Sequence, residues 1–357
     1  MSTALLTSLG RLLPLELHGA GGLVELEPRF GVAPLERTRW GEGDYVVGRV
    51  TPRSPLRIPF ELPTGRLVEA GEGDRVLGAL GTRAATLEVV GDWRAVGADG
   101  ALQALTPAGL MGQVTSKSDQ VPDLVELAYE GHLLEGERPL RMDDFVPARG
   151  RGSFSLPVVL IVGSSMSAGK TTTGRRLVRV LRSLGHRVLA AKLTGAARYR
   201  DVLSLGDAGA EWIFDFVDAG LPSTVCEPEV YRAKLRDLLA RMGELPADVA
   251  VFEAGASPLE PYNGSVAFEE LRPHLACTVL CASDPYAVVG IIDAFGHRPD
   301  LVAGPTANTE AGVQLVKRLA QVRALDARQR EAEPELRRLL ERALKSACAS
   351  GAASPPA

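Results

Sequence analysis

The pattern of apolar and polar positions along the chain changes near residue 150. Before it, short apolar runs occur at 45–50, 75–80 and 85–90, and polar Gly-Glu-Gly-Asp turns precede the first two, at 41–44 and 71–74. Short strands between tight turns are typical of β-rich modules, so residues 1–146 are expected to form a barrel-like β domain. One segment departs from this pattern, because Leu124, Leu127 and Leu133 have helical spacing and predict a helix over 121–134.

After a Gly- and Arg-rich segment at 147–156, which is expected to be a linker, the pattern becomes strand, glycine loop, helix, strand. This order is typical of a βαβ unit and predicts a parallel sheet for residues 157–345. Stretches rich in Arg and Leu after residue 312 predict one or two amphipathic helices that cover the sheet or a partner subunit, so a homodimer is one expectation. Residues 346–357 are small and predict a disordered tail. The expected fold class is α/β, with a parallel-sheet domain preceded by a smaller β-rich domain.

Three apolar runs mark strands of this sheet. Residues 157–162 are continuously apolar, as a strand covered on both faces requires, and the runs 187–195 and 248–256 have the same character. Helical spacing begins at Lys170 and stops at Gly185. The first strand and this helix enclose a glycine loop, which is the context that a phosphate-binding loop needs.

The loop reads GSSMSAGKTTT from Gly163 to Thr173. The pattern G-x-x-x-x-G-K-[ST] places a glycine at Ser164, whereas here the glycine comes one residue earlier. In such a loop backbone N–H groups converge on a phosphate, the lysine neutralises it, and the hydroxyl that follows binds Mg²⁺. The candidate cofactor-binding residues are Gly163, Ser164, Ser165, Ser167, Ala168, Gly169, Lys170, Thr171, Thr172 and, farther along the chain, Asn308.

Charged residues end two of the later strands. Lys192 ends the second strand and Glu253 the acidic strand, where side chains face the ligand crevice of a parallel sheet. Lys170, Lys192 and Glu253 are therefore the candidate catalytic residues, and Thr171 and Glu253 the candidate magnesium ligands. The alternative for Lys192 and Glu253 is a solvated position at a strand end. Asn308 is expected either to reach a nucleotide base or to cap the next helix.

The candidate substrate contacts lie in the segments that follow these strands. Arginine binds carboxylates and phosphates with two parallel hydrogen bonds, and a carboxylate binds a metal or an amine. Each residue has an alternative as a helix cap or a solvated side chain. The candidates are Thr194, Arg198, Asp215, Ser257, Glu260 and Asn263.

The loop, with five residues between Gly163 and Gly169, resembles that of dethiobiotin synthetase. A closer resemblance is to the carboxyl-terminal half of a bacterial family of unknown function that includes a D-glutamate N-acetyltransferase. The elements that match in order are Gly163 to Thr173, Thr194-Gly195, Asp215-Phe216, Glu253 to Pro261 with Gly264 to Val266, Val279 to Cys281 with Asp284-Pro285, and Asn308-Thr309. This resemblance implies a P-loop NTPase-like domain over roughly residues 157–312.

The chain also departs from that family. Glu260 stands where the family has a histidine before proline, and residues 1–150 look β-rich where the family has a nucleotide-fold domain. A similar loop is found in the adaptor protein of molybdopterin guanine dinucleotide biosynthesis. The loop alone therefore does not select a reaction.

Composition narrows the class of protein. Lys and Arg total 40 against 44 Asp and Glu, with no basic tract, which argues against a nucleic-acid binder. The four cysteines form no CxxC pair, and Cys277 and Cys281 share strand parity as buried packing residues do. No apolar run has the roughly 18 to 20 residues of a membrane span. A cytoplasmic protein without a membrane or nucleic-acid partner is expected.

Three functions remain open. The first is an Mg-ATP enzyme of the kinase or ligase kind, which phosphorylates or activates a small metabolite that bears a carboxylate. ATP is preferred because no guanine-specific Asn-Lys-x-Asp motif follows the acidic strand. The second is an acyl-CoA-dependent N-acyltransferase of an amino acid, which uses the loop to hold the phosphates of acetyl-CoA, as the family resemblance implies. The third is a nucleotide-binding adaptor or chaperone with slow hydrolysis.

Overall fold

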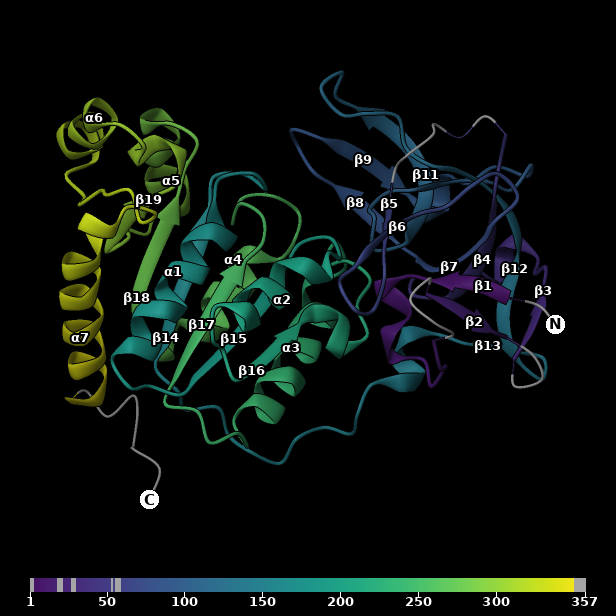
Figure 1. Ribbon diagram of the computed structural model, residues 1–357, viewed down its shortest axis with the longest axis horizontal. Helices are drawn as coiled ribbons and strands as arrows, with labels where there is room; N and C mark the ends of the chain where they lie inside the picture. Colours follow the sequence, from purple (N-terminus) through teal and green to yellow (C-terminus); the bar gives the residue numbers. More distant parts are fainter. Residues whose placement is uncertain (1–2, 18–21, 27–29, 53, 55–58, 350–357) are drawn as a thin grey trace. The chain divides into compact units, whose positions relative to one another are not determined.

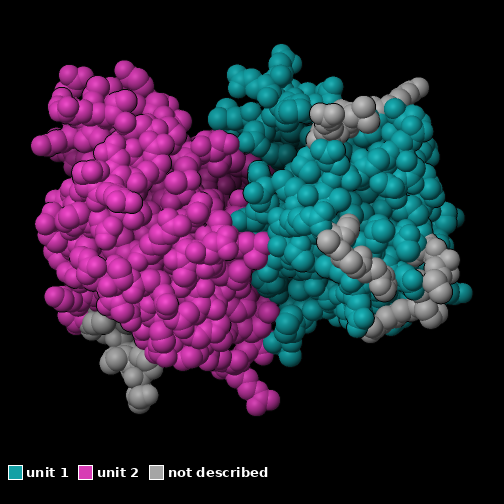
Figure 2. All heavy atoms as spheres, viewed as in Figure 1, with its two compact units in different colours: residues 1–148, 196–200, 216–225 teal, residues 149–195, 201–215, 226–357 magenta. Residues whose placement is uncertain are grey.

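The computed structural model of the protein describes residues 3–17, 22–26, 30–52, 54 and 59–349. Its contacts divide the chain into two compact units (Figure 2). Unit 1 comprises residues 1–148, 196–200 and 216–225, and unit 2 comprises residues 149–195, 201–215 and 226–357. Each unit is considered by itself below.

Unit 1 is built from short strands (Figure 1). They are β1 (Thr3–Leu6), β2 (Leu23–Glu25), β3 (Gly31–Ala33), β4 (Tyr45–Val50), β5 (Pro59–Glu61), β6 (Leu67–Glu69), β7 (Arg75–Leu80), β8 (Thr82–Ala84), β9 (Val89–Asp92), β10 (Ala101–Ala104), β11 (Leu110–Lys117), β12 (Glu126–Glu135) and β13 (Arg138–Pro139). The pairings β4–β7, β7–β11, β11–β10, β10–β12 and β12–β4 close into a ring. The β-rich architecture expected for this part of the chain is confirmed, and its central strands form a closed barrel.

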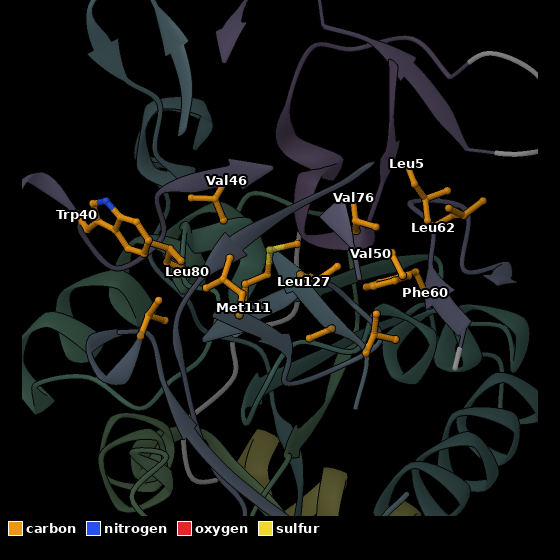
Figure 3. Packing of buried hydrophobic residues seen from close by; sticks show 14 residues of the cluster. Leu5, Trp40, Val46, Val50, Phe60, Leu62, Val76, Leu80, Met111 and Leu127 are labelled. Carbon is orange, nitrogen blue, oxygen red and sulfur yellow. The ribbon is translucent and has the colours of Figure 1, made fainter. Parts of the chain in front are cut away.

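Alternate residues of the ring strands meet in one hydrophobic core (Figure 3). Members from the ring strands include Val46, Val50, Val76, Leu80, Leu102, Ala104, Met111 and Leu127. Glycines occupy the middle inward positions of β4 and β7. A Cβ at Gly48 would lie 3.0 Å from Cβ of Leu127, and one at Gly78 would lie 2.2 Å from the carbonyl oxygen of Gly109. The barrel is too narrow for a side chain at these two positions.

Two local predictions in unit 1 are wrong. The segment 121–134, predicted as a helix, contains most of strand β12, and the run 85–90 is a turn followed by the start of β9. β12 pairs with β4 on one side and β10 on the other, with a bulge between Tyr129 and Gly131. Backbone pairing on both sides outweighs the helical spacing of three leucines, because β structure is decided by neighbouring strands.

Two short segments of unit 1, 196–200 and 216–225, come from the part of the sequence assigned to the α/β domain. A β-bridge joins Ala196 to Ser223. Arg11 forms an ion pair with Asp218 at 3.0 Å, and its guanidinium lies 4.3 Å from the ring centroid of Tyr199. Local sequence patterns do not reveal this grouping, because it depends on contacts between residues distant in sequence.

Unit 2 has a parallel sheet with the order β16-β15-β17-β14-β18-β19 among the described residues. Its strands are β14 (Val158–Gly163), β15 (Val188–Thr194), β16 (Trp212–Asp215), β17 (Val249–Ala254), β18 (Leu275–Cys281) and β19 (Leu301–Ala303). The helices are α1 (Lys170–Ser183), α2 (Tyr199–Asp207), α3 (Pro228–Met242), α4 (Gly264–Leu271), α5 (Pro285–Phe295), α6 (Glu310–Ala320) and α7 (Glu333–Ala349) (Figure 1). The predicted α/β fold class is confirmed.

The position of β14 explains where a ligand is expected. All residues of β14, β15 and β17 are buried, as strands covered on both faces require. β14 lies between β17 and β18, and the chain continues from it to β15 on one side and later to β18 on the other. The strand order therefore reverses at β14. Open parallel sheets bind ligands outside the carboxyl ends of their strands at such a point, which is where the glycine loop follows β14.

Residues near both ends of unit 2 are held by contacts within the unit. Gly152 of the predicted linker donates its backbone N–H to Glu244 at 3.1 Å. α7 continues to Ala349, four residues into the segment 346–357 predicted to be disordered, because apolar residues such as Leu340 and Leu344 are buried along it. Residues 350–357 lie outside the described residues. None of the helices in the described part of the chain has the length and apolar character needed to cross a bilayer.

Candidate functional site

The glycine loop is anchored at the residue that departs from the usual pattern. The backbone N–H of Ser164 donates to the carbonyl of Cys281 at 2.9 Å, and the N–H of Ser283 donates to Ser164 Oγ at 3.1 Å. Ser164 thus extends the pairing of β14 with β18 by one residue before the loop turns. A glycine is not required here, because the backbone is still held in the manner of a strand.

Lys170, the first residue of α1, is buried within the loop. Its Nζ donates to the carbonyl oxygens of Ser165 at 2.6 Å and Met166 at 3.3 Å. A Cβ at Gly163 would lie 2.8 Å from both Cδ and Nζ of this lysine, so the early glycine gives the lysine its space. Burial lowers the pKa of Lys170, and the negative charge of Glu253 opposes that effect. The ammonium group is held at the centre of the loop.

The amino end of α1 has the backbone features of an anion site. Gly169 precedes the helix with φ of 88°, a left-handed conformation that favours glycine. In the described part of the chain, the backbone N–H groups of Ala168, Gly169 and Lys170 donate to no acceptor. Unpaired N–H groups at a helix amino terminus attract phosphate and other anions, because the helix dipole adds partial positive charge there.

The loop meets β17 through a hydroxyl and a carboxylate. Thr171 Oγ1 donates to Glu253 Oε2 at 2.9 Å, although the two residues are 82 positions apart. Glu253 is 3% exposed, and burial together with the negative charge of Asp201 raises its pKa, which Lys170 opposes. No group of three or more His, Cys, Asp or Glu side chains that would hold a metal occurs among the described residues. A hydroxyl and one carboxylate suit Mg²⁺, which usually completes its shell with water and substrate phosphates.

Lys192 lies beside this pair in a row of charged residues. In register, Asp215 of β16 is next to Lys192 of β15, which is next to Glu253 of β17. Lys192 Nζ forms an ion pair with Asp201 Oδ2 at 2.6 Å. Burial lowers the pKa of Lys192, but Asp201, Glu253 and Asp215 together outweigh it, so that the pKa is raised. The structure thus brings together the predicted residues Lys170, Thr171, Lys192, Asp215 and Glu253.

Asp201 was not predicted as a site residue. It lies in the first turn of α2, nine positions after the lysine that it contacts. The signal in the sequence was an acidic residue at the start of the helix that follows a lysine-ended strand. Acidic residues are common in a first helical turn for electrostatic reasons, so this signal alone does not indicate a functional contact.

Three predicted substrate contacts lie together in the loop after β17. Glu260 accepts a hydrogen bond from the backbone N–H of Ser257 at 2.7 Å. Asn263 has a positive φ of 60° and donates from Nδ2 to the carbonyl of Cys226 at 2.9 Å. These contacts shape the loop itself. Of the other predicted residues, Thr194 is fully buried at the end of β15, and Arg198 is exposed in a segment of unit 1.

A small cavity lies beside the amino end of α1. Its volume is about 100 Å³, and its walls are formed by Gly169, Thr172, Thr173, Gly304, Pro305, Asn308, Asp326, Ala327 and Arg328. A Cβ at Gly304 would lie 2.4 Å from the carbonyl oxygen of Ala168, so this turn touches the glycine loop. The next helix, α6, is capped by Thr309 and not by Asn308. Asn308 is exposed on the cavity wall. No motif in the sequence pointed to Asp326 or Arg328 as neighbours of the loop.

No family model matches this chain, and no curated protein matches it. Among solved structures, it is similar to a DUF1611 family protein from Anabaena variabilis, with 15% identity and a TM-score of 0.37 over 55% of this chain and 62% of that one. The signal recognition particle 54 kDa protein from Aeropyrum pernix K1, in complex with GDP, has 20% identity and a TM-score of 0.32 over 55% of this chain and 51% of that one. A ParA family ATPase from Chlorobium tepidum has 14% identity and a TM-score of 0.31 over 54% and 93%.

The chain therefore spans less than two thirds of the first two of these proteins. Likenesses this distant carry no argument about function. The chain's own fold and site define its class: β14, the glycine loop and α1 form a strand–loop–helix unit of the P-loop NTPase kind, at the switch point of a parallel sheet.

Proposed function

We propose that this protein is an enzyme that binds Mg-ATP at residues 163–171 and uses it to phosphorylate or activate a small metabolite that bears a carboxylate. The observation that carries the proposal is the 2.9 Å hydrogen bond from Thr171 Oγ1 to the buried Glu253 carboxylate, beside two buried lysines. Such an arrangement places hard oxygen ligands next to positive charge, which is the chemistry that a metal-bound polyphosphate needs.

The residues present fit this cofactor. Unpaired N–H groups of Ala168 to Lys170 suit phosphate oxygens. The carboxylates of Asp201, Asp215 and Glu253 act on Lys192, and a divalent cation would balance their negative charge. Mg²⁺, when bound, neutralises phosphate charge and draws electrons from the bond to be broken. Lys170 supplies fixed positive charge within the loop.

The cavity beside Asn308 supports adenine as the base. An asparagine amide presents one donor and one acceptor in a plane, and this pair is complementary to N7 and the amino group of adenine. The 100 Å³ cavity adjoins α1 on the side of Thr172 and Thr173. A base there would remain connected to phosphates at the loop through the ribose.

Thermal unfolding with ATP, GTP and acetyl-CoA, each with and without Mg²⁺, tests the proposal. A ligand at about 100 times its Kd adds about 2.7 kcal/mol of stability. In a unit of this size that corresponds to a rise of roughly 5 to 10 °C in Tm. We expect this rise with Mg-ATP for the wild type and for the exposed-lysine control Lys317→Ala, but not for Lys170→Ala.

The ligands also separate the competing functions. Stabilisation by acetyl-CoA without any response to ATP would replace the proposed function with acyl transfer. A larger response to GTP than to ATP would overturn the assignment of the base. No response to any of the three would remove the phosphate-loop interpretation itself.

A further inference from the structure

Lys192 occupies a passage that is shaped around its side chain. Lys192 lies two residues before the carboxyl end of β15, and its side chain is 6% exposed. A Cβ at Gly255 would lie 2.7 Å from Lys192 Cε and 2.1 Å from the carbonyl oxygen of Thr194, and a Cβ at Gly195 would lie 3.4 Å from the same Cε. The lysine therefore passes between two glycines, and a larger residue at Gly255 would displace it.

The end of this side chain is fixed by a carboxylate from another element. Asp201 lies in the first turn of α2 and accepts a charge-assisted hydrogen bond from Lys192 Nζ at 2.6 Å. Its side chain is 24% exposed, whereas Glu253 and Asp215 are 3% and 1% exposed. Asp201 thus binds the ammonium from the solvent side, while the two more deeply buried carboxylates flank Lys192 along the sheet.

Lysine has four rotatable methylene bonds, so burial of its stem does not by itself determine where the ammonium lies. A helix-mounted carboxylate at hydrogen-bond distance removes that freedom. Charge held in place before reaction stabilises a transition state more than mobile charge does, because no reorganisation is needed as negative charge develops.

On the basis of the function proposed above, we propose that Asp201 is a positioning residue, which holds the Lys192 ammonium at the carboxyl end of the sheet where the terminal phosphate of the nucleotide reacts. Lys192 is the group that meets the transferring charge, and Asp201 acts through it. Neither the glycine loop nor the metal ligands include Asp201, so its loss is expected to leave nucleotide binding intact.

Two affinities separate positioning from binding: that for Mg-ADP, and that for Mg-ADP with aluminium fluoride, which mimics the transferring phosphoryl group. The variants are Lys192→Met, Asp201→Asn, Asp201→Glu and the double variant Lys192→Met/Asp201→Asn. A matched control is Asp248→Asn. It removes the 2.8 Å ion pair between Asp248 and Arg187, which directly precede β17 and β15 at the amino ends of these strands.

We expect every variant to bind Mg-ADP within about threefold of the wild type, since Lys170 and Thr171 are unchanged. The affinity for the aluminium fluoride complex should fall about tenfold or more in Lys192→Met and Asp201→Asn, the equivalent of one charged hydrogen bond. Asp201→Glu should recover part of this loss, because it keeps the charge. The control should bind like the wild type.

The double variant keeps the test decisive if Asp201→Asn folds poorly. An unpaired buried ammonium destabilises a protein, and removal of both partners relieves that cost. If Asp201 acts only through Lys192, the double variant should bind the complex as Lys192→Met does. A further loss, or full or increased affinity in Asp201→Asn, would overturn the inference. Failure of the wild type to bind Mg-ADP would instead overturn the proposed function, and this inference with it.

Discussion

Replacement of Gly163 by alanine tests whether the early glycine of the loop makes room for Lys170. The new Cβ would lie 2.8 Å from Lys170 Cδ, where carbon atoms prefer about 3.5 to 4.0 Å. The lysine must therefore retreat by about 0.7 Å or more. Its 2.6 Å hydrogen bond to the Ser165 carbonyl would then lengthen beyond the usual range.

The effect should appear in ligand binding more than in folding. A misplaced charged hydrogen bond costs about 1.5 to 3 kcal/mol, so the affinity for Mg-ATP should fall about tenfold to a hundredfold. The atoms that move belong to a flexible side chain, so the free energy of unfolding should fall by about 1 kcal/mol or less. Isothermal titration calorimetry and urea denaturation measure the two quantities.

Gly290→Ala is the matched control. This glycine lies within α5, and a Cβ there would meet nothing within 4 Å. We expect alanine to stabilise the helix by about 0.5 to 1 kcal/mol and to leave Mg-ATP affinity unchanged. Full affinity in Gly163→Ala, measured beside a weakened Lys170→Ala, would refute the idea that the early glycine serves the lysine.

Other contacts give separate tests. Thr171→Val removes the donor to Glu253 and should weaken nucleotide binding in Mg²⁺ much more than in chelator, as calorimetry measures; equal losses would argue against a metal role. Hydrogen bonds from two arginines of α3 lower the pKa of Glu270, so its contribution to stability is present above about pH 4.3 and disappears as the pH falls through the lowered pKa. Denaturation at pH 7 and pH 3 should therefore show a loss of stability in Glu270→Gln that is smaller at pH 3 than at pH 7, and an equal loss at both would contradict the charge argument. Asp44→Ala leaves Arg141 and the backbone N–H of Gly41 without their buried carboxylate, so the free energy of unfolding should fall by about 3 kcal/mol or more. The exposed Asp123→Ala should change it little, and urea denaturation of both variants measures the difference.

Much of the loop and its surroundings could be predicted because the information is local. A continuous apolar run, a glycine loop and a helix that begins at Lys170 stand next to one another in sequence, and the structure has them as β14, the loop and α1. The positions of Lys192 and Glu253 near the carboxyl ends of β15 and β17 could be predicted in the same way, because buried parallel strands appear in the sequence as continuous apolar runs.

The contacts between these elements could not be predicted from the sequence. The pairing of Lys192 with Asp201 and the contact of Gly304 with the loop depend on tertiary packing, which no local pattern encodes. The segment 121–134 shows the same limit, since its leucines fit a helix and only the neighbouring strands β4 and β10 make it a strand.

The sequence by itself thus determined the change from β-rich to α/β patterns near residue 150. It also determined the glycine loop and the charged residues near the carboxyl ends of the parallel strands. The tertiary structure alone decided the strand order that puts β14 at the switch point, the hydrogen bond of Thr171 to Glu253 across 82 positions, and the glycine-lined passage of Lys192. The physical reason is that the apolar pattern of a helix or strand is visible within a short stretch of consecutive residues. Strand pairing and charge pairing, in contrast, are set by whichever distant residues the packed core brings together.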